Sequence, residues 1–132
     1  MDRALVRLVW SRARDRCEYC LISQDYDEVP FEVDHIIAKK HRGPTESNNL
    51  ALSCFACNSS KGSNIAGRDI RTGKLAPLFH PRRHKWTRHF RWAGPTLIGK
   101  TPIGRVTIEV LNINDSLRVE LRRELAAEGE LD

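Results

Sequence analysis

Long apolar runs are absent from this sequence of 132 residues. No stretch approaches the ~20 consecutive apolar residues that span a bilayer, which argues against a helical membrane protein. Residues 1–17 also lack the apolar core and the small-residue cleavage site of a secretory signal peptide. We therefore expect a soluble cytoplasmic protein, in a compartment where disulfide bonds are rare.

Acidic residues are missing from a long part of the chain. The net charge is +5 and the pI is about 9.3, and no Asp or Glu occurs from Arg71 to Thr107. Within that part, residues 80–92 (HPRRHKWTRHFRW) hold five Arg or Lys and three His, interleaved with aromatic residues. Cations of this density favour a nucleic-acid partner, although ordinary solubility is an alternative explanation of the charge. The residues expected to bind DNA in this run are Arg82, Arg83, Lys85 and Arg88.

Cysteine is scarce, and its four copies form two C-x-x-C pairs separated by 33 residues. The pairs consist of Cys17, Cys20, Cys54 and Cys57. Two such pairs can place four thiolates around one tetrahedral ion, and zinc is the expected metal in a small cytosolic domain. An iron–sulfur cluster, a redox C-x-x-C and four unrelated buried thiols are the alternatives. We expect a structural zinc, because four thiolates leave no coordination position open for water.

An acidic and an imidazole side chain, Asp34 and His35, are adjacent between the two pairs, in FEVDHIIAKK (31–40). Successive residues of a strand point to opposite faces, so the two side chains can have different roles. Hydrolysis of a phosphodiester needs a general base for water and a metal ion at the phosphate. Histidine titrates near neutrality and suits the base, whereas Asp34 and Asn58 offer the oxygen ligands that magnesium or manganese prefers.

Four short segments resemble the HNH endonuclease family. They are CEYC, VDHI, NNLALSCFACN and NSSK, which lie between residue 17 and about residue 64. The resemblance implies a ββα-metal unit, in which two antiparallel strands and a helix surround one catalytic divalent ion, braced by the zinc knuckles. The downstream basic part, with IGKTPIGR (98–105), is similar to small stand-alone bacterial members of the family.

The resemblance also implies a role for five residues. His35 would be the general base, and Asp34 and Asn58 would hold the magnesium-type ion. Asn49 would clamp the loop that orients the histidine, and Lys61 would lie near the phosphate and contact DNA. A helix cap is a competing role for Asn58, and a solvated surface position is the competing interpretation of Lys61.

Some features depart from the family pattern. Asn58 stands where some members have a histidine, and RGPTES (42–47) replaces a double-glycine turn, with a Pro44 that cannot adopt a positive φ. Three histidines of the basic run are further candidate metal ligands, with phosphate contact or solvation as the alternatives. They are His80, His84 and His89.

Local patterns predict the secondary structure. Helical spacing predicts a helix over residues 3–13, and alternation predicts a strand over 28–37. A helix is expected to begin near Asn58, followed by an extended linker with turns over 68–83. Thr101 and Pro102 predict a helix start, although Val106, Ile108 and Val110 also alternate as a strand would. A last helix is predicted over 114–128, as part of the core or of a dimer contact.

The predicted fold class is α+β: a ββα-metal unit braced by a four-cysteine zinc site, with an N-terminal helix and a helical C-terminal extension. One domain is expected, with its core over about 14–68 and the extension over about 69–132. The expected function is metal-dependent hydrolysis of phosphodiester bonds in double-stranded DNA. The alternatives are a non-catalytic zinc-knuckle module that binds nucleic acid and a zinc-braced interaction protein.

Overall fold

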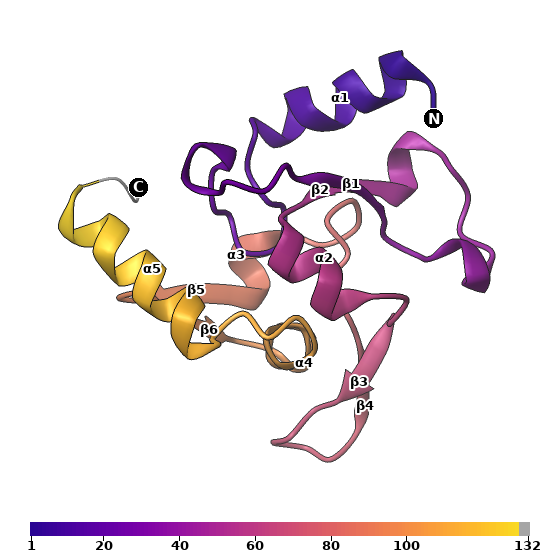
Figure 1. Ribbon diagram of the computed structural model, residues 1–132. Coiled ribbons are helices and arrows are strands. Elements are labelled where there is room, and N and C mark those ends of the chain that lie inside the picture. The colour runs from indigo at the N-terminus through magenta and orange to yellow at the C-terminus, as the bar shows by residue number, and fades with distance from the viewer. Residues whose placement is uncertain (130–132) are drawn as a thin grey trace.

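Small antiparallel hairpins surrounded by helices make up the fold (Figure 1). The structure is a computed structural model that describes residues 1–129. Its helices are α1 (Arg3–Ala13), α2 (Phe55–Lys61), α3 (Trp86–His89), α4 (Pro102–Val110) and α5 (Ser116–Ala127). Its strands are β1 (Glu32–His35), β2 (Leu50–Ser53), β3 (Ala66–Arg68), β4 (Leu75–Pro77), β5 (Phe90–Ala93) and β6 (Thr96–Gly99). The architecture is mixed α and β, as the sequence predicts.

The first hairpin and the helix after it form a ββα unit. β1 pairs antiparallel with β2, and His35 lies opposite Leu50 in the register. Every residue of β2 is buried, so this strand is the inner one of the pair. β1 is shorter than the predicted strand 28–37, because residues 28–30 are exposed and lie outside the ladder.

α2 begins earlier than predicted, at Phe55. The reason is its cap: Cys54 has extended backbone, and its sulfur accepts a hydrogen bond from the amide of Cys57 at 3.4 Å. Asn58 therefore lies inside the helix, and the alternative that it caps the helix is wrong.

The segment predicted as an extended linker is instead a second hairpin, β3–β4. The carboxylate of Asp69 organises its turn by accepting hydrogen bonds from the Thr72 hydroxyl at 2.9 Å and from the Arg105 guanidinium at 2.9 and 3.0 Å. A side chain at Gly67 would meet Val106 of α4 at 2.9 Å, so the glycine allows the hairpin to lie directly on that helix. These long-range contacts fold a segment whose own sequence has turn residues but no strand-like alternation.

The helices predicted at 3–13 and from Pro102 are confirmed. The Thr101 hydroxyl accepts a hydrogen bond from Gly104 N at 3.1 Å, so the cap decides for a helix over the alternating strand pattern. The last helix is also present. Of its three leucines, Leu117 is 80% exposed, Leu121 is 39% exposed, and only Leu125 lies in the core.

Residues from both halves of the chain share one hydrophobic core, including Val9, Leu52, Leu97 and Leu125. The indole of Trp86 donates a hydrogen bond to the Tyr19 carbonyl at 2.9 Å, which joins the extension to the first knuckle. Within residues 1–129, no helix combines the length and the apolar character that a bilayer crossing requires.

Replacing Asp69 by Asn is expected to lower the melting temperature at pH 7. The Arg105 guanidinium holds the pKa of Asp69 well below its usual range, with help from Thr72 and against the effect of burial. The ionised form is therefore favoured by folding. This stabilisation is present above the usual value of about 3.9 and is lost as the pH falls through the lower folded value. Thermal melts from pH 7 to pH 2 should show the gap between wild type and variant closing below about pH 4. The exposed Asp25 changed to Asn is the control, and an equal gap at every pH would contradict this account.

Candidate active site and metal centre

The four cysteines converge from two distant parts of the chain. Their sulfur atoms all lie within 4.8 Å of one another, all four residues are buried, and none forms a disulfide. The Sγ atoms of Cys20 and Cys54 are 3.8 Å apart, which equals the spacing of about 3.8 Å expected when zinc holds each sulfur at about 2.3 Å in a tetrahedron. The donor set and its spacing therefore fit a structural zinc ion.

A guanidinium from the last helix lies against this sulfur cluster. Arg118 Nη2 is 2.9 Å from the Sγ atom of Cys57 and 4.0 Å from that of Cys54. Burial would lower the pKa of Arg118, but the neighbouring cysteine sulfurs raise it above its usual value. Four thiolates around a divalent ion carry two net negative charges, so a cation here compensates them and ties α5 to the knuckles.

Asp34 occupies the third position of β1 and has one oxygen engaged by the protein. Its Oδ2 atom lies 3.0 Å from the Lys61 ammonium and accepts a hydrogen bond of 3.4 Å from the Tyr19 hydroxyl. Burial raises the pKa of Asp34, while Lys61 and Tyr19 act in the opposite direction. Within residues 1–129 the Oδ1 atom has no hydrogen-bond partner, so it is available to a ligand.

His35 follows Asp34 and points to a different neighbour, as alternation along a strand requires. Its Nε2 atom lies 2.8 Å from the hydroxyl oxygen of Thr45. Partial burial and then the charge of Lys39 lower the pKa of His35, whereas Asp34 raises it. A lowered pKa favours the neutral imidazole, which is the form that can accept a proton.

Asn49 is buried and fixes the loop that follows His35. Its Oδ1 atom accepts a hydrogen bond from the Ile37 amide at 2.9 Å, and its Nδ2 atom donates to the carbonyls of Ile37 at 3.0 Å and of Pro44 at 2.8 Å. The positive φ that Pro44 cannot adopt occurs at Arg42, at 65°. A side chain at Gly43 would meet the Ile37 carbonyl oxygen at 1.7 Å, so the turn closes only with glycine there.

Lys61 does not have the position expected from the sequence. It is 1% exposed, and its ammonium donates to the His35 carbonyl at 3.1 Å in addition to pairing with Asp34. This burial contradicts the alternative that Lys61 is a solvated surface lysine, whereas its contact with the phosphate and with DNA stays a prediction. Asn58 lies three residues before Lys61 on α2 and therefore on the same helix face. Its side chain has no hydrogen-bond partner in the described part of the chain.

Only part of the basic run is free to meet a phosphate. Arg83, Lys85 and Arg88 are exposed. Arg82 instead forms an ion pair with Glu18, with 17% of its side chain exposed, and its contact with DNA stays a prediction. This pairing joins the run to the first knuckle.

The histidines of the run are structural in this fold. His80 and His89 are each 7% exposed, so plain solvation is wrong for them. The His84 Nδ1 atom accepts a hydrogen bond from the amide of His80, and the His89 Nδ1 atom lies 2.6 Å from the hydroxyl oxygen of Thr101. Burial, followed by the charge of Arg83, lowers the pKa of His80 to about 4. Among the described residues, the four cysteines are the only group of three or more His, Cys, Asp or Glu close enough to share an ion.

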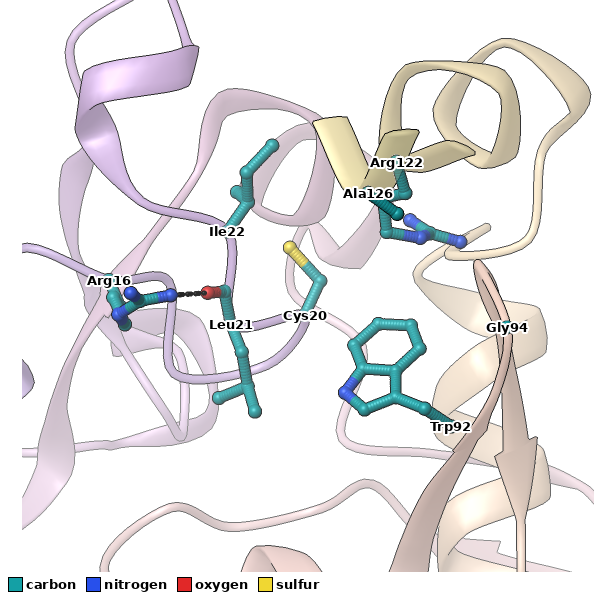
Figure 2. Close-up of a pocket in the computed structure, with 8 residues that line it drawn as sticks. All are labelled: Arg16, Cys20, Leu21, Ile22, Trp92, Gly94, Arg122 and Ala126. Carbon is teal, nitrogen blue, oxygen red and sulfur yellow. Dashed lines mark hydrogen bonds between the residues drawn. The ribbon is translucent and has the colours of Figure 1, made fainter. Parts of the chain in front are cut away.

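A cavity of about 440 Å³ is lined by Cys20, Trp92 and Arg122, among others, and neither Asp34 nor His35 is part of its lining (Figure 2). Trp92 and Arg122 face Cys20 across it, and the Arg122 guanidinium lies 5.3 Å from the centre of the indole ring. A smaller cavity of about 170 Å³ adjoins the ββα unit and is lined by Ile36, Ile37, Lys61, Ile65, Pro77 and Arg83, among others. Another cavity, of about 410 Å³, is lined by Asn49, Arg82 and Arg83, among others, so both of these cavities adjoin candidate site residues.

Sequence reasoning missed three residues of these sites. Tyr19 bonds Asp34 and lies inside the first cysteine pair, which was the one available signal. Thr45 and Arg118 meet His35 and Cys57 only through the tertiary fold, and nothing in their local sequence marks them.

Comparisons with known proteins agree with this arrangement. Residues 17–64 match the family model described as HNH endonuclease. The chain is 28% identical over 115 residues to the Septu protein PtuB of Bacillus thuringiensis, and the match covers 86% of this chain and 42% of that protein. The chain thus spans less than half the length of this curated relative, and no solved structure matches it significantly. The family description suggests a nuclease acting on nucleic acid. Residues 17–64 of this chain are therefore similar to an HNH endonuclease domain, in agreement with the resemblance seen in its sequence.

Proposed function

We propose that this protein is a metal-dependent endonuclease that hydrolyses phosphodiester bonds in double-stranded DNA. The observation that carries the proposal is the placement of Asp34 and His35 at consecutive positions of β1, facing different neighbours beside α2. A binding module needs neither a neutral imidazole nor a carboxylate with a free oxygen at this point of the fold.

Asp34 and Asn58 would hold the catalytic magnesium-type ion. The fit rests on donor chemistry: the Oδ1 atom of Asp34 and the amide of Asn58 lack partners within residues 1–129, and both are hard oxygen donors. Lys61 and Tyr19 hold the other oxygen of Asp34, which keeps the carboxylate oriented. When bound, such an ion stabilises charge on the phosphate and on the departing oxygen.

His35 accepts the proton of the attacking water. Its lowered pKa favours the neutral imidazole, and the contact with Thr45 defines the direction of the ring. Asn49 acts through the backbone, because it fixes Ile37 and Pro44 and with them the loop that carries Thr45. We therefore treat Asn49 as a positioning residue.

Supercoiled plasmid provides the direct test. Purified protein is incubated with magnesium, with manganese and without added divalent metal, and single-stranded DNA, double-stranded DNA and RNA are compared as substrates. We expect nicked or linear plasmid with either metal and intact plasmid when no divalent metal is added, while the structural zinc stays bound. Retained DNA binding with no cleavage under any metal would favour the non-catalytic zinc-knuckle module.

Removing the exposed cations of the basic run should weaken DNA binding equally for all sequences. Replacing Arg83, Lys85 and Arg88 by Ala is expected to reduce the slope of log affinity against log salt by up to ~3, about one per lost phosphate contact. Fluorescence anisotropy across a salt series measures the slope. The control removes the exposed Arg3, Arg7 and Arg123, which causes the same loss of charge elsewhere. Equal slopes for the variant and the control would show that the run is a solvated surface.

A further inference from the structure

The β3–β4 hairpin, residues 66–77, projects from the body of the molecule (Figure 1). Its inner face packs on α4 through Gly67 and the buried Ala76. Ile70 and Leu75 point the other way and are 77% and 80% exposed. Two branched apolar side chains this exposed at a hairpin end have no partner within the described part of the chain.

The hairpin end is held rigidly. Asp69 N donates to the Lys74 carbonyl at 2.8 Å and Gly73 N donates to the Asp69 carbonyl at 2.7 Å, which closes the turn. Gly73 has a positive φ of 73°, which the turn requires. The Asp69 carboxylate is anchored to Arg105 of α4. The exposed apolar side chains are therefore presented on a fixed frame rather than on a loose loop.

The charge of the hairpin is of one sign. Arg68, Arg71 and Lys74 are exposed beside the two apolar residues, and Arg68 lies opposite Leu75 in the register. Asp69 is the only carboxylate of the hairpin and is neutralised by Arg105. Cations flanking exposed apolar side chains match DNA, whose phosphates border stacked apolar bases.

The hairpin is also next to the candidate active site. β3 begins shortly after α2, the helix of Asn58 and Lys61. Ile65 and Pro77, at the base of the hairpin, line the same 170 Å³ cavity as Lys61. Leu78 N donates to the Ile65 carbonyl at 3.0 Å, which closes that base. A duplex lying along the catalytic unit would therefore reach the hairpin.

We propose that this hairpin is a DNA-distorting arm. Ile70 and Leu75 enter a groove of the duplex and unstack a base step beside the cleaved phosphate, while Arg68, Arg71 and Lys74 bind the flanking phosphates. The inference rests on the proposed function in taking duplex DNA as the substrate. It goes further by naming the element that deforms the duplex, a use of apolar wedges known from minor-groove binding.

The test measures binding and base unstacking without cleavage, in buffer with no added divalent metal and no chelator, so that the structural zinc stays bound. The probe is a short duplex with 2-aminopurine, whose fluorescence rises when the base unstacks. We expect the wild type to raise the fluorescence. The double variant I70S/L75S should lose this rise and bind about 10-fold more weakly, since two apolar contacts are lost. Leu117→Ser on α5 is the matched control, because Leu117 is as exposed as Leu75.

The charged residues are tested separately. Replacing Arg68, Arg71 and Lys74 by Ala should reduce the salt slope by up to ~3 while leaving some of the fluorescence rise. If I70S/L75S matches the Leu117→Ser control in both affinity and fluorescence, the proposal is overturned. Normal DNA behaviour with an altered oligomeric state would also overturn it, and would indicate a protein-docking surface.

The two proposals fail independently. If the wild type never cleaves plasmid but unstacks the duplex through Ile70 and Leu75, the proposed nuclease activity is contradicted and the DNA-distorting arm is supported. If wild type and I70S/L75S cleave plasmid at the same rate and give the same 2-aminopurine fluorescence, the nuclease activity is supported and the DNA-distorting arm is contradicted.

Discussion

Replacing His35 by Ala is expected to slow plasmid cleavage by about 10²- to 10⁴-fold, the usual effect of removing a positioned general base. Fold, zinc content and DNA affinity should not change. His35 takes no part in the cysteine cluster, and its side chain contacts the Thr45 hydroxyl at the half-exposed end of β1. The measurement is the single-turnover rate of plasmid nicking at saturating metal, together with circular dichroism and elemental analysis.

Asp34→Ala is the comparison that separates the base from the metal ligand. It should also remove cleavage, but its residual rate should rise with metal concentration, because the lost oxygen lowers metal affinity. The His35→Ala rate should not respond to metal in this way. Cleavage by His35→Ala at near the wild-type rate, in a preparation shown to be free of contaminating nuclease, would contradict the catalytic assignment.

Replacing Cys54 by Ser is expected to give protein without zinc that is unfolded or insoluble. A structural zinc contributes an apparent binding free energy of about 10–16 kcal/mol, whereas a whole domain is stabilised by about 5–15 kcal/mol. Cys54 also caps α2, and a serine hydroxyl can form the same cap, so the expected effect comes from the loss of the ion. Elemental analysis of wild type purified without added metal should give about one zinc per chain.

Cys54→His is the matched control for this prediction. Imidazole is also a zinc ligand, so this variant should retain zinc and much of the fold that the serine variant loses. Near-UV circular dichroism and a zinc-release assay compare the two. A Cys54→Ser protein that is well folded, free of zinc and normally active would show that the cluster has no structural role.

The local features of the fold could be predicted from the sequence. Two C-x-x-C pairs place their sulfurs by short-range geometry, and the four sulfurs are brought within reach of one ion. The helical spacing of apolar residues in α1 and the Thr101 cap with Pro102 at the start of α4 involve residues close in sequence. Both helices could therefore be predicted from local patterns. The adjacency of Asp34 and His35 is a local feature too, because alternation along a strand by itself directs the carboxylate and the imidazole to opposite faces.

Only the tertiary structure decided which polar groups are free. Lys61 and Arg82 appear in the sequence as available cations, yet their partners, Asp34 and Glu18, are brought to them by folding. Residues 66–77 show no strand pattern in the sequence, and the hairpin was missed because contacts from Arg105 and Val106 on α4 stabilise it. The charge compensation of the cysteine cluster by Arg118 arises in the same way. Local sequence determines which groups a segment can offer, whereas burial and pairing depend on residues far along the chain that only the folded core brings into contact.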